Sequence, residues 1–559
     1  MPGKNQLKDK RYLAVGAGVV AIVLLAVILV VTRGQTPSSP AEPTPTPGPD
    51  PVAMKTDSVL LDLMQAYRLG GAAEAERFAR NRGILTNDNL VRLTLVLDTE
   101  DTLATTAKLQ EIGAKVEASN GNLITASAPL TLIMEKAKDI TKPGFFDSLA
   151  GLEHVVDIRI PSRPEPDSAQ PMSEGVGLTA AAEWHDAGIT GKGVKVGVLD
   201  AGFEGYQSLL GTGLPERVTV KAFTSNGEIA PEGASHGTAC AEIVHEMAPE
   251  AEMYLAAWET EADWFNAVDW LVSQGVRVIS QSMGDFSAPF DGTGTRAQKI
   301  DELRAKGILW VNSNGNYAQE HYAAKLNPDV EGWHQFAPGK TRMKVAPYGN
   351  GSFYLNWRDW QNRTVDYDLY IFNSQDEIVA SSRNVQGGGK APVEWVYLRS
   401  AKGETYYVGI KAKDPSRMLP FDFYLIHGDI EFPVPQNSIN TYSSAKGAFA
   451  VGAINARTGK LEPYSSWGPT WDGRPKPDIS APTVVSTLVP DYSQNGFNGT
   501  SAATPHVAGA AALVLSANPS LTPDKVIQFL EEHAIDLGTV GVTVKDCRVG
   551  YGLLYLGEP

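Results

Sequence analysis

The hydrophobic pattern of the chain opens with an uncharged apolar run, Tyr12–Thr32, which is long enough to cross a bilayer as a helix. Basic residues are concentrated before this run, and only Arg33 follows it closely. The positive-inside bias therefore predicts a cytoplasmic tail at 1–11 and places everything downstream outside. The run exceeds the ~7–15 residue core of a signal peptide, and no A-x-A site follows it. These features favour a signal anchor at 12–32 over the competing cleaved signal peptide.

The next segments predict a tether and a small α+β domain. Residues 33–54 are rich in Pro, Ser and Thr and are expected to be extended. Alternating apolar and polar positions then predict strands, with helical periodicity between them, at 91–98, 102–112 (helix), 114–119, 122–129 and 155–162. With a further helical stretch before the last strand, this β-α-β-β-α-β order predicts a split βαβ domain over 55–165. Pro and charged residues return at 161–171, which indicates an exposed boundary.

From residue 166 the pattern is that of an α/β domain. Apolar strands are expected at 194–200, 276–280, 308–312 and 448–454, and helices at 262–275 and 521–534. Strands that alternate with helices predict a mostly parallel sheet with helices on both faces, formed by 166–325 and 435–559. Residues 326–434 lack helical periodicity and alternate as strands do, which predicts an all-β sandwich inserted into the α/β domain.

Composition and charge exclude several classes of protein. The chain has 48 Lys and Arg against 64 Asp and Glu, a formal net charge of −16, and no concentrated basic stripe. Nucleic acid is therefore not an expected partner, because phosphate binding needs positive charge. The two cysteines, Cys240 and Cys547, are too few for a disulfide scaffold or a Cys-rich zinc site, and the sequence leaves open whether they pair.

In an open parallel sheet, functional groups gather at the carboxyl ends of the strands. Chemically useful groups are expected at the ends of three strands. Asp200 ends 194–200, Ser282, Met283 and Gly284 follow 276–280, and Ser313, Asn314, Gly315 and Asn316 follow 308–312. A carboxylate after a strand also serves as a turn or cap residue, so Asp200 by itself indicates no chemistry.

A general base has to come from the nine histidines. His236 opens a run of small residues, which would let a helix lie close to the sheet and present this imidazole at the sheet's edge. Cys240, one helical turn further on, could form a Cys–His pair, but nothing nearby would activate it and a buried free cysteine is the commoner state. A zinc-protease motif fails because Pro249 stands where a second histidine is required. His506 is expected to be a packed or capping side chain.

A nucleophile is suggested by Ser501, which lies between Gly499–Thr500 and an alanine-rich helix in which Pro505 is expected in the first turn. The N-terminal pole of a helix favours negative charge formed beside it. A serine before a helix is also a common N-cap, and the sequence around Ser501 alone does not separate these interpretations.

Four successive segments resemble the signatures of subtilisin-like serine proteases: "GKGVKVGVLDAGFEG", "SHGTACAEIVHEMAP", "VNSNGNYA" and "NGTSAATPHVAGAAAL". The order Asp, His, Ser is that of the subtilisin triad. The resemblance implies that Asp200 orients the base, His236 moves the proton and Ser501 attacks the peptide carbonyl. It implies that the Asn316 side-chain amide and the Ser501 N–H stabilise the oxyanion.

The same resemblance implies the substrate and the partners. The backbone at Ser282–Gly284 and Ser313–Gly315 would pair with an extended protein or peptide substrate as an added strand. The N-terminal domain resembles the propeptides of the family, which implies an intramolecular inhibitor and chaperone that is cut near 161–172. Anchored precursor and released extracellular product would then both exist.

Metals and cofactors are not expected, and no metal ligand is assigned. Structural calcium is left open with unknown ligands. Asp366 and Asp368 could bind calcium, but alternating acids on an exposed strand face are favoured. Ala201 follows the aspartate where many relatives have Thr or Ser, a mild departure from the family pattern.

Two other functions are alternatives to a subtilisin-like protease. An esterase of the α/β-hydrolase class would need G-x-S-x-G, but Ala503 stands at the last position, and the triad order differs. A catalytically silent surface-binding protein on a subtilase fold is the alternative function, and the filled catalytic positions count against it.

Overall fold

The computed structural model describes residues 51–559 except 82–83, 87, 138–143, 162–164, 167–173, 387–388, 493–495 and 538–544. The predicted anchor at 12–32 lies outside the described residues, as does most of the predicted tether. The end of that tether instead forms α2 (Pro51–Lys55), which packs against α6 (Phe145–Ala150) and β4 (Val155–Arg159). In the part of the chain that the structure describes, no helix has both the length and the apolar character that a membrane crossing needs.

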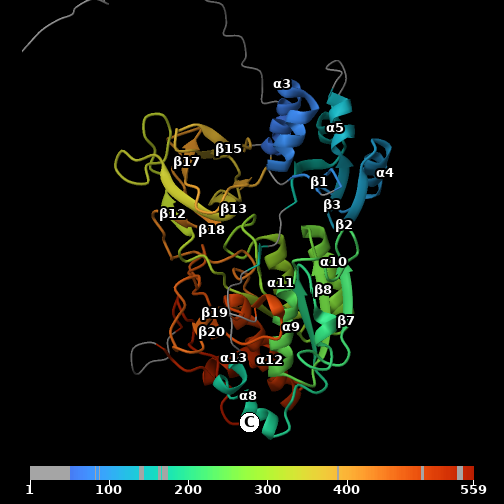
Figure 1. Ribbon diagram of the computed structural model, residues 1–559, viewed down its shortest axis with the longest axis vertical. Helices are drawn as coiled ribbons and strands as arrows, with labels where there is room; N and C mark the ends of the chain where they lie inside the picture. Colours follow the sequence, from blue (N-terminus) through green and yellow to red (C-terminus); the bar gives the residue numbers. More distant parts are fainter. Residues whose placement is uncertain are drawn as a thin grey trace, which may run out of the picture. The chain divides into compact units, whose positions relative to one another are not determined.

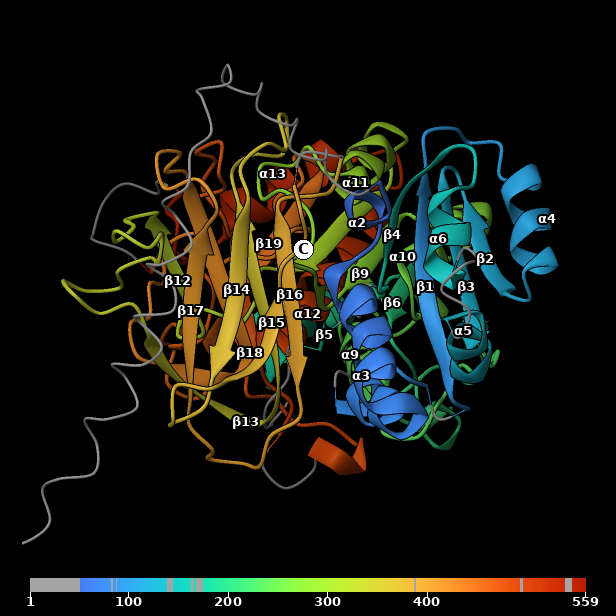
Figure 2. The same cartoon turned by 90° about the horizontal axis from the view of Figure 1, so that it is seen from above.

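From β1 onward the N-terminal α+β domain has the predicted order of elements, and two helices that were not predicted precede it (Figure 2). Besides α2, α6 and β4 it contains α3 (Ser58–Asn81), β1 (Leu90–Leu97), α4 (Leu103–Glu111), β2 (Lys115–Asn120), β3 (Leu123–Pro129) and α5 (Leu130–Ala137). The sheet order is β2-β3-β1-β4, and each neighbouring pair is antiparallel. Strand β3 therefore lies between β1 and β2, which run parallel to each other, and the predicted split βαβ arrangement is confirmed.

A seven-stranded parallel sheet forms the centre of the α/β domain, in the order β20-β19-β11-β9-β6-β8-β7. The strands are β6 (Lys195–Asp200), β7 (Thr219–Phe223), β8 (Glu252–Trp258), β9 (Val278–Gln281), β11 (Leu309–Ser313), β19 (Ala448–Asn455) and β20 (Ile479–Thr483). Four of them were expected from the sequence. Strands β7, β8 and β20 were not predicted.

Helices cover both faces of this sheet, as predicted. The helices α9 (His236–Met247), α12 (Thr500–Ala517) and α13 (Pro523–His533) share one apolar core with the sheet. The helices α10 (Glu261–Ser273) and α11 (Thr295–Ala305) share a second core on the other face. Figure 1 shows α10 in green beside β7 and β8. Strand β6 lies between β9 and β8, so its carboxyl end is flanked by a strand on each side.

The segment between the two halves of the α/β domain is all-β and antiparallel. Its strands are β12 (His321–Lys325), β13 (Met343–Trp357), β14 (Tyr367–Phe372), β15 (Ile378–Ser382), β16 (Val393–Leu398), β17 (Tyr406–Ala412) and β18 (Pro420–Ile430). The long strand β13 pairs with β18 along most of its length, with β17 near its start and with β16 near its end. The pairing changes partner where the β13–β18 register shifts, between Pro347 and Ser352. We call residues 321–430 the insert.

Candidate active site

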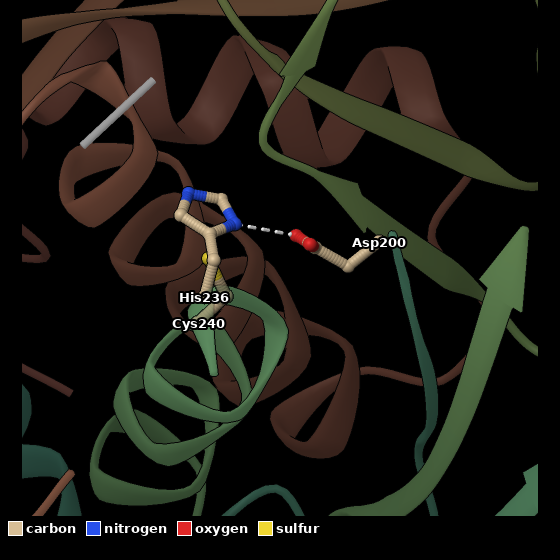
Figure 3. Close-up of side chains that lie close together, drawn as sticks. All are labelled: Asp200, His236 and Cys240. Atoms are coloured by element: carbon tan, nitrogen blue, oxygen red, sulfur yellow. Dashed lines mark hydrogen bonds and ion pairs between the residues drawn. The ribbon is translucent and has the colours of Figure 1, made fainter. Parts of the chain in front are cut away.

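Asp200 and His236 form a buried hydrogen-bonded pair at the carboxyl edge of the parallel sheet (Figure 3). Asp200 ends β6, and His236 is the first residue of α9. The Asp200 Oδ2 to His236 Nδ1 distance is 2.9 Å, and the other carboxylate oxygen accepts the Ala201 N–H at 2.8 Å. Because each carboxylate oxygen has its own donor, the carboxylate is fixed in position and orients the imidazole.

Small residues in α9 allow this approach. A Cβ atom on Gly237 would lie 2.5 Å from the Gly202 carbonyl oxygen and 2.8 Å from the Asp200 Cβ, so any side chain there would push the helix away from β6. The expectation that the small-residue helix presents His236 at the sheet's edge is thus consistent with the packing of α9 on β6.

Ser501 lies at the start of α12, which packs directly against α9. Its hydroxyl is fully buried and donates to the Ser282 carbonyl oxygen at 3.4 Å, while the Ser282 hydroxyl donates to the Ser501 carbonyl oxygen at 3.0 Å. Phe497, just before α12, places its ring edge-on to the His236 imidazole, with centroids 5.4 Å apart. The candidate nucleophile and the candidate base therefore lie on neighbouring helix ends.

Because of Pro505, the Ser501 carbonyl oxygen can accept a hydrogen bond from a side chain. The helix begins at Thr500, so Pro505 lies beyond the first turn, and the expectation that it lies within the first turn is wrong. A proline has no N–H to give to the carbonyl four residues earlier, which here is Ser501. The Ser282 hydroxyl takes that place, with the Cys240 thiol at 3.7 Å from the same oxygen.

Asn316 is held by Thr500, a residue that the sequence analysis did not single out. The Asn316 Oδ1 accepts the Thr500 N–H at 2.9 Å and the Thr500 hydroxyl at 3.0 Å. The Thr500 hydroxyl also accepts the Gly315 N–H at 3.2 Å. With its oxygen occupied by two donors, the Asn316 amide must direct its NH₂ group elsewhere, as an oxyanion donor would. In the sequence, the signal that could have identified Thr500 is its position next to Ser501.

The segment Ser282–Gly284 binds an extended strand of the same chain. Strand β10 (Met283–Gly284) pairs antiparallel with β5 (Glu165–Pro166), with Met283 opposite Pro166 and Gly284 opposite Glu165. This is the added-strand geometry that was expected for a substrate at this edge.

The second predicted substrate-binding segment, Ser313–Gly315, has its backbone groups engaged inside the protein. The Asn314 N–H donates to Val451, and the Asn314 and Gly315 carbonyls accept from Asn440 and Ser466. Ser313 lies in β11 and accepts from the Asn440 side chain. These bonds make the segment a rigid wall next to Asn316.

His506 is a packed residue, as expected. It is fully buried in α12, its Nδ1 lies 2.7 Å from the Ala502 carbonyl oxygen, and burial lowers its pKa to about 4. A Cβ on Gly175 would lie 1.7 Å from the His506 Nε2, so α7 (Gly175–Leu178) can only start there with glycine.

One group of side chains within the described ranges has the spacing of a metal site, and it is part of the candidate active site. The ligand atoms of Asp200, His236 and Cys240 lie within 4.8 Å of one another (Figure 3). A metal ion there would displace the hydrogen bond between Asp200 and His236. Cys240 and Cys547 are both free thiols in the structure.

The expectation that Asp366 and Asp368 lie on an exposed strand face is wrong. Asp368 is fully buried, pairs with Lys413 at 2.5 Å and accepts the Tyr370 hydroxyl at 2.9 Å. The side chains of Lys413 and Tyr370 lie against the Asp368 carboxylate and separate it from solvent. Burial and the Asp368 carboxylate raise the pKa of Asp366 to about 7.

The parallel sheet, the helices on both of its faces and the acid–imidazole pair at its carboxyl edge define a subtilisin-like α/β fold. Residues 191–333 and 431–552 match the model of the Subtilase family, Peptidase_S8. The unmatched stretch between these ranges contains most of the insert. The chain is 24% identical to the minor extracellular protease Vpr of Bacillus subtilis over 433 residues, which are 66% of this chain and 52% of Vpr.

A second relative and a solved structure agree with this match. Subtilisin E of Bacillus subtilis is 24% identical over 388 residues, 66% of this chain and 68% of subtilisin E. The CspB protease of Clostridium perfringens, at 15% identity, shares the fold with a TM-score of 0.52 over 69% of this chain and 98% of CspB. The family match and these relatives support assignment to the subtilase family. The chain spans about half the length of Vpr.

Proposed function

We propose that this chain is a serine endopeptidase that cleaves protein or peptide substrates through Ser501, His236 and Asp200. The observation that carries the proposal is the buried hydrogen bond between Asp200 Oδ2 and His236 Nδ1, at the sheet edge where α12 begins with Ser501. The subtilase match over both halves of the α/β domain supports it.

The proposed reaction uses each group in turn. His236 takes the proton of the Ser501 hydroxyl as the oxygen attacks the substrate carbonyl, and Asp200 stabilises the imidazolium that forms. The carbonyl oxygen becomes an oxyanion, which the Asn316 NH₂ group stabilises. His236 then gives the proton to the leaving amine. Water repeats the sequence on the acyl-enzyme and releases the acid.

A fluorophosphonate probe tests the proposal directly. We expect it to label Ser501, and we expect His236→Ala and Ser501→Ala to abolish labelling. Incubation of the protein with a denatured proteome, followed by mapping of new termini, should show peptide-bond cleavage that both variants lack. A wild-type chain that is neither labelled nor cleaves anything would favour the catalytically silent binding protein instead.

The N-terminal domain is proposed to act as an intramolecular inhibitor and folding aid. The pairing of β5 with β10 supports this, because a substrate would need the same backbone groups of Met283 and Gly284. The domain also contacts the α/β domain through charged groups: Arg159 and Glu261 form an ion pair at 2.5 Å, with both side chains largely buried.

The cellular location is proposed to be the membrane, with the catalytic part outside and partial release after processing. Similarity to Vpr, a minor extracellular protease, supports the extracytoplasmic part. Fractionation of cells that produce Ser501→Ala and wild type tests this. We expect the uncut variant in the membrane fraction, and its appearance in the cytoplasm would contradict the proposal.

A further inference from the structure

The substrate residue whose carbonyl is attacked has to lie between two backbone segments. On one side is Ser282, whose carbonyl accepts the Ser501 hydroxyl at 3.4 Å. On the other side is Gly315, which directly precedes the proposed oxyanion donor Asn316. If the substrate pairs with Ser282–Gly284 as an added strand, with its carbonyl carbon at Ser501 and the oxygen at Asn316, we expect the side chain of that residue to point to the space between Ser282–Gly284 and Ser313–Gly315. We call this space the slot.

Both walls of the slot meet the same side chain, that of Tyr317. A Cβ on Gly315 would lie 2.7 Å from the Cδ2 and Cε2 atoms of Tyr317, and a Cβ on Gly284 would lie 2.8 Å from its hydroxyl oxygen. The tyrosine ring thus extends from Gly315 at one wall to Gly284 at the other. The two glycines leave room for the ring, and a larger residue at either position would collide with it.

Tyr317 is fixed in this position by its neighbours. Its N–H donates to the Ser466 hydroxyl at 2.9 Å, and the residue is only 2% exposed. Its ring meets the ring of Phe286 edge-on, with centroids 4.8 Å apart. Tyr424 of the insert packs on Phe286 at 4.5 Å and edge-on to Tyr317 at 5.9 Å. A side chain held on three sides does not swing away at low cost, because it would leave a cavity in a packed aromatic cluster.

We propose that Tyr317 determines the specificity of this peptidase by filling the slot, so that the residue before the cleaved bond must have a short side chain. The insert contributes to this specificity through Tyr424, whose ring packs edge-on to the Tyr317 ring. The inference rests on the proposed function and goes beyond it by naming the substrate class. Peptides with Ala or Ser at this position are substrates, and those with Phe or Leu are excluded by the ring.

The test compares peptides that differ only at the residue before the cleaved bond. For the wild type we expect kcat/KM with Ala or Ser to exceed that with Phe or Leu by at least about tenfold, because a filled apolar pocket discriminates by size. Tyr317→Ala should open the slot and raise kcat/KM for Phe by about tenfold or more relative to Ala. Tyr317→Phe is the matched variant, since it keeps the ring, and it should keep the wild-type preference. Tyr555→Ala, an exposed tyrosine at the end of the chain, should change nothing.

The outcomes separate this inference from the proposed function. Wild-type cleavage with a preference for Phe or Leu would overturn the role of Tyr317 and leave the peptidase intact. Failure of probe labelling and of cleavage of all peptides would overturn both. The side-chain preference of the wild type can be measured even if Tyr317→Ala does not fold. In a folded Tyr317→Ala chain, an unchanged preference for Ala would also overturn it.

Discussion

The side-chain oxygen of Asn316 accepts two hydrogen bonds from Thr500, one from its backbone N–H at 2.9 Å and one from its hydroxyl at 3.0 Å. Thr500 directly precedes the proposed nucleophile Ser501, so one short segment carries the nucleophile and orients the group that faces it across the substrate. This contact fixes the direction of the Asn316 amide, because an amide whose oxygen is occupied has only its NH₂ group left to donate.

The contact predicts how two substitutions differ. Asn316→Ala should lower kcat by about 10²–10³ with little change in KM, because the lost bond forms only in the transition state. Thr500→Val should lower kcat by a smaller factor, since it leaves the Asn316 amide in place but removes one of its two anchors. Thr500→Ser keeps the hydroxyl and should restore most of the rate. Steady-state kinetics on one peptide checks this, and a Thr500→Val defect confined to KM would contradict it.

The register of β5 on β10 predicts the site of self-cleavage. Met283 pairs with Pro166, and Ser282, which directly precedes Met283, accepts the Ser501 hydroxyl through its carbonyl oxygen. Because the slot takes only a short side chain, we expect cleavage after Ser168 or Ala169, the first short residues after Pro166, which gives a new N-terminus at Ala169 or Gln170. N-terminal sequencing of the processed wild-type chain checks this. Ser501→Ala should stay uncut. Identical processing in both chains would show that the chain does not cut itself through Ser501.

A buried ion pair joins the N-terminal domain to the insert, and its loss should loosen that domain. Lys390 Nζ lies 3.2 Å from Asp157 Oδ1, and both side chains are nearly inaccessible. Lys390→Met leaves the Asp157 carboxylate with Arg159, at 3.3 Å, as its remaining partner, so the cost should be below the about 3–5 kcal/mol of a buried charge left alone. We expect trypsin to attack the N-terminal domain of Ser501→Ala at a lower urea concentration when Lys390 is replaced.

The matched control for this ion pair is the exposed Lys402→Met in the same insert, which should leave the trypsin sensitivity unchanged. The double variant Lys390→Met with Asp157→Leu removes both charges and should recover much of the loss. An equal sensitivity of Lys390→Met and Lys402→Met would show that the pair does not hold the domain.

A buried histidine in the insert predicts lower stability in acid. Burial lowers the pKa of His334 from its usual 6.5 to about 4, and its Nδ1 accepts the Asn327 N–H at 3.1 Å, which requires the unprotonated nitrogen. The unfolded chain binds a proton below about pH 6.5 while the folded chain resists it, so stability falls as the pH drops from 6.5 to 4. A shift of this size corresponds to about 3 kcal/mol.

Urea unfolding of Ser501→Ala at pH 7.5 and pH 5 measures the effect of this histidine. His334→Gln should be less stable at pH 7.5 but should lose less stability between the two pH values. An equal loss in His334→Gln and the parent would contradict the assignment.

The sequence by itself was sufficient for the class of each domain and for the four motifs. Strand alternation and helical periodicity are local properties, so the split βαβ domain, the strand that ends at Asp200, the strand that precedes Asn316 and the all-β insert could be predicted without coordinates. The short strand β7 and the buried β8 and β20 were missed. Burial of Asp368 was also missed, because the same alternation describes an exposed strand and one that a neighbouring element covers.

Only the tertiary structure decided which distant groups meet. Thr500 holds Asn316 across 184 positions of the chain, and Tyr317 reaches the glycine of a neighbouring strand. Neither contact has a sequence signature, because each depends on how β9, β11 and α12 come together at one edge of the sheet. Local patterning determined the elements and the candidate chemistry. Long-range packing, which sets the distances between side chains, decided how the site is oriented and what fills the slot beside it.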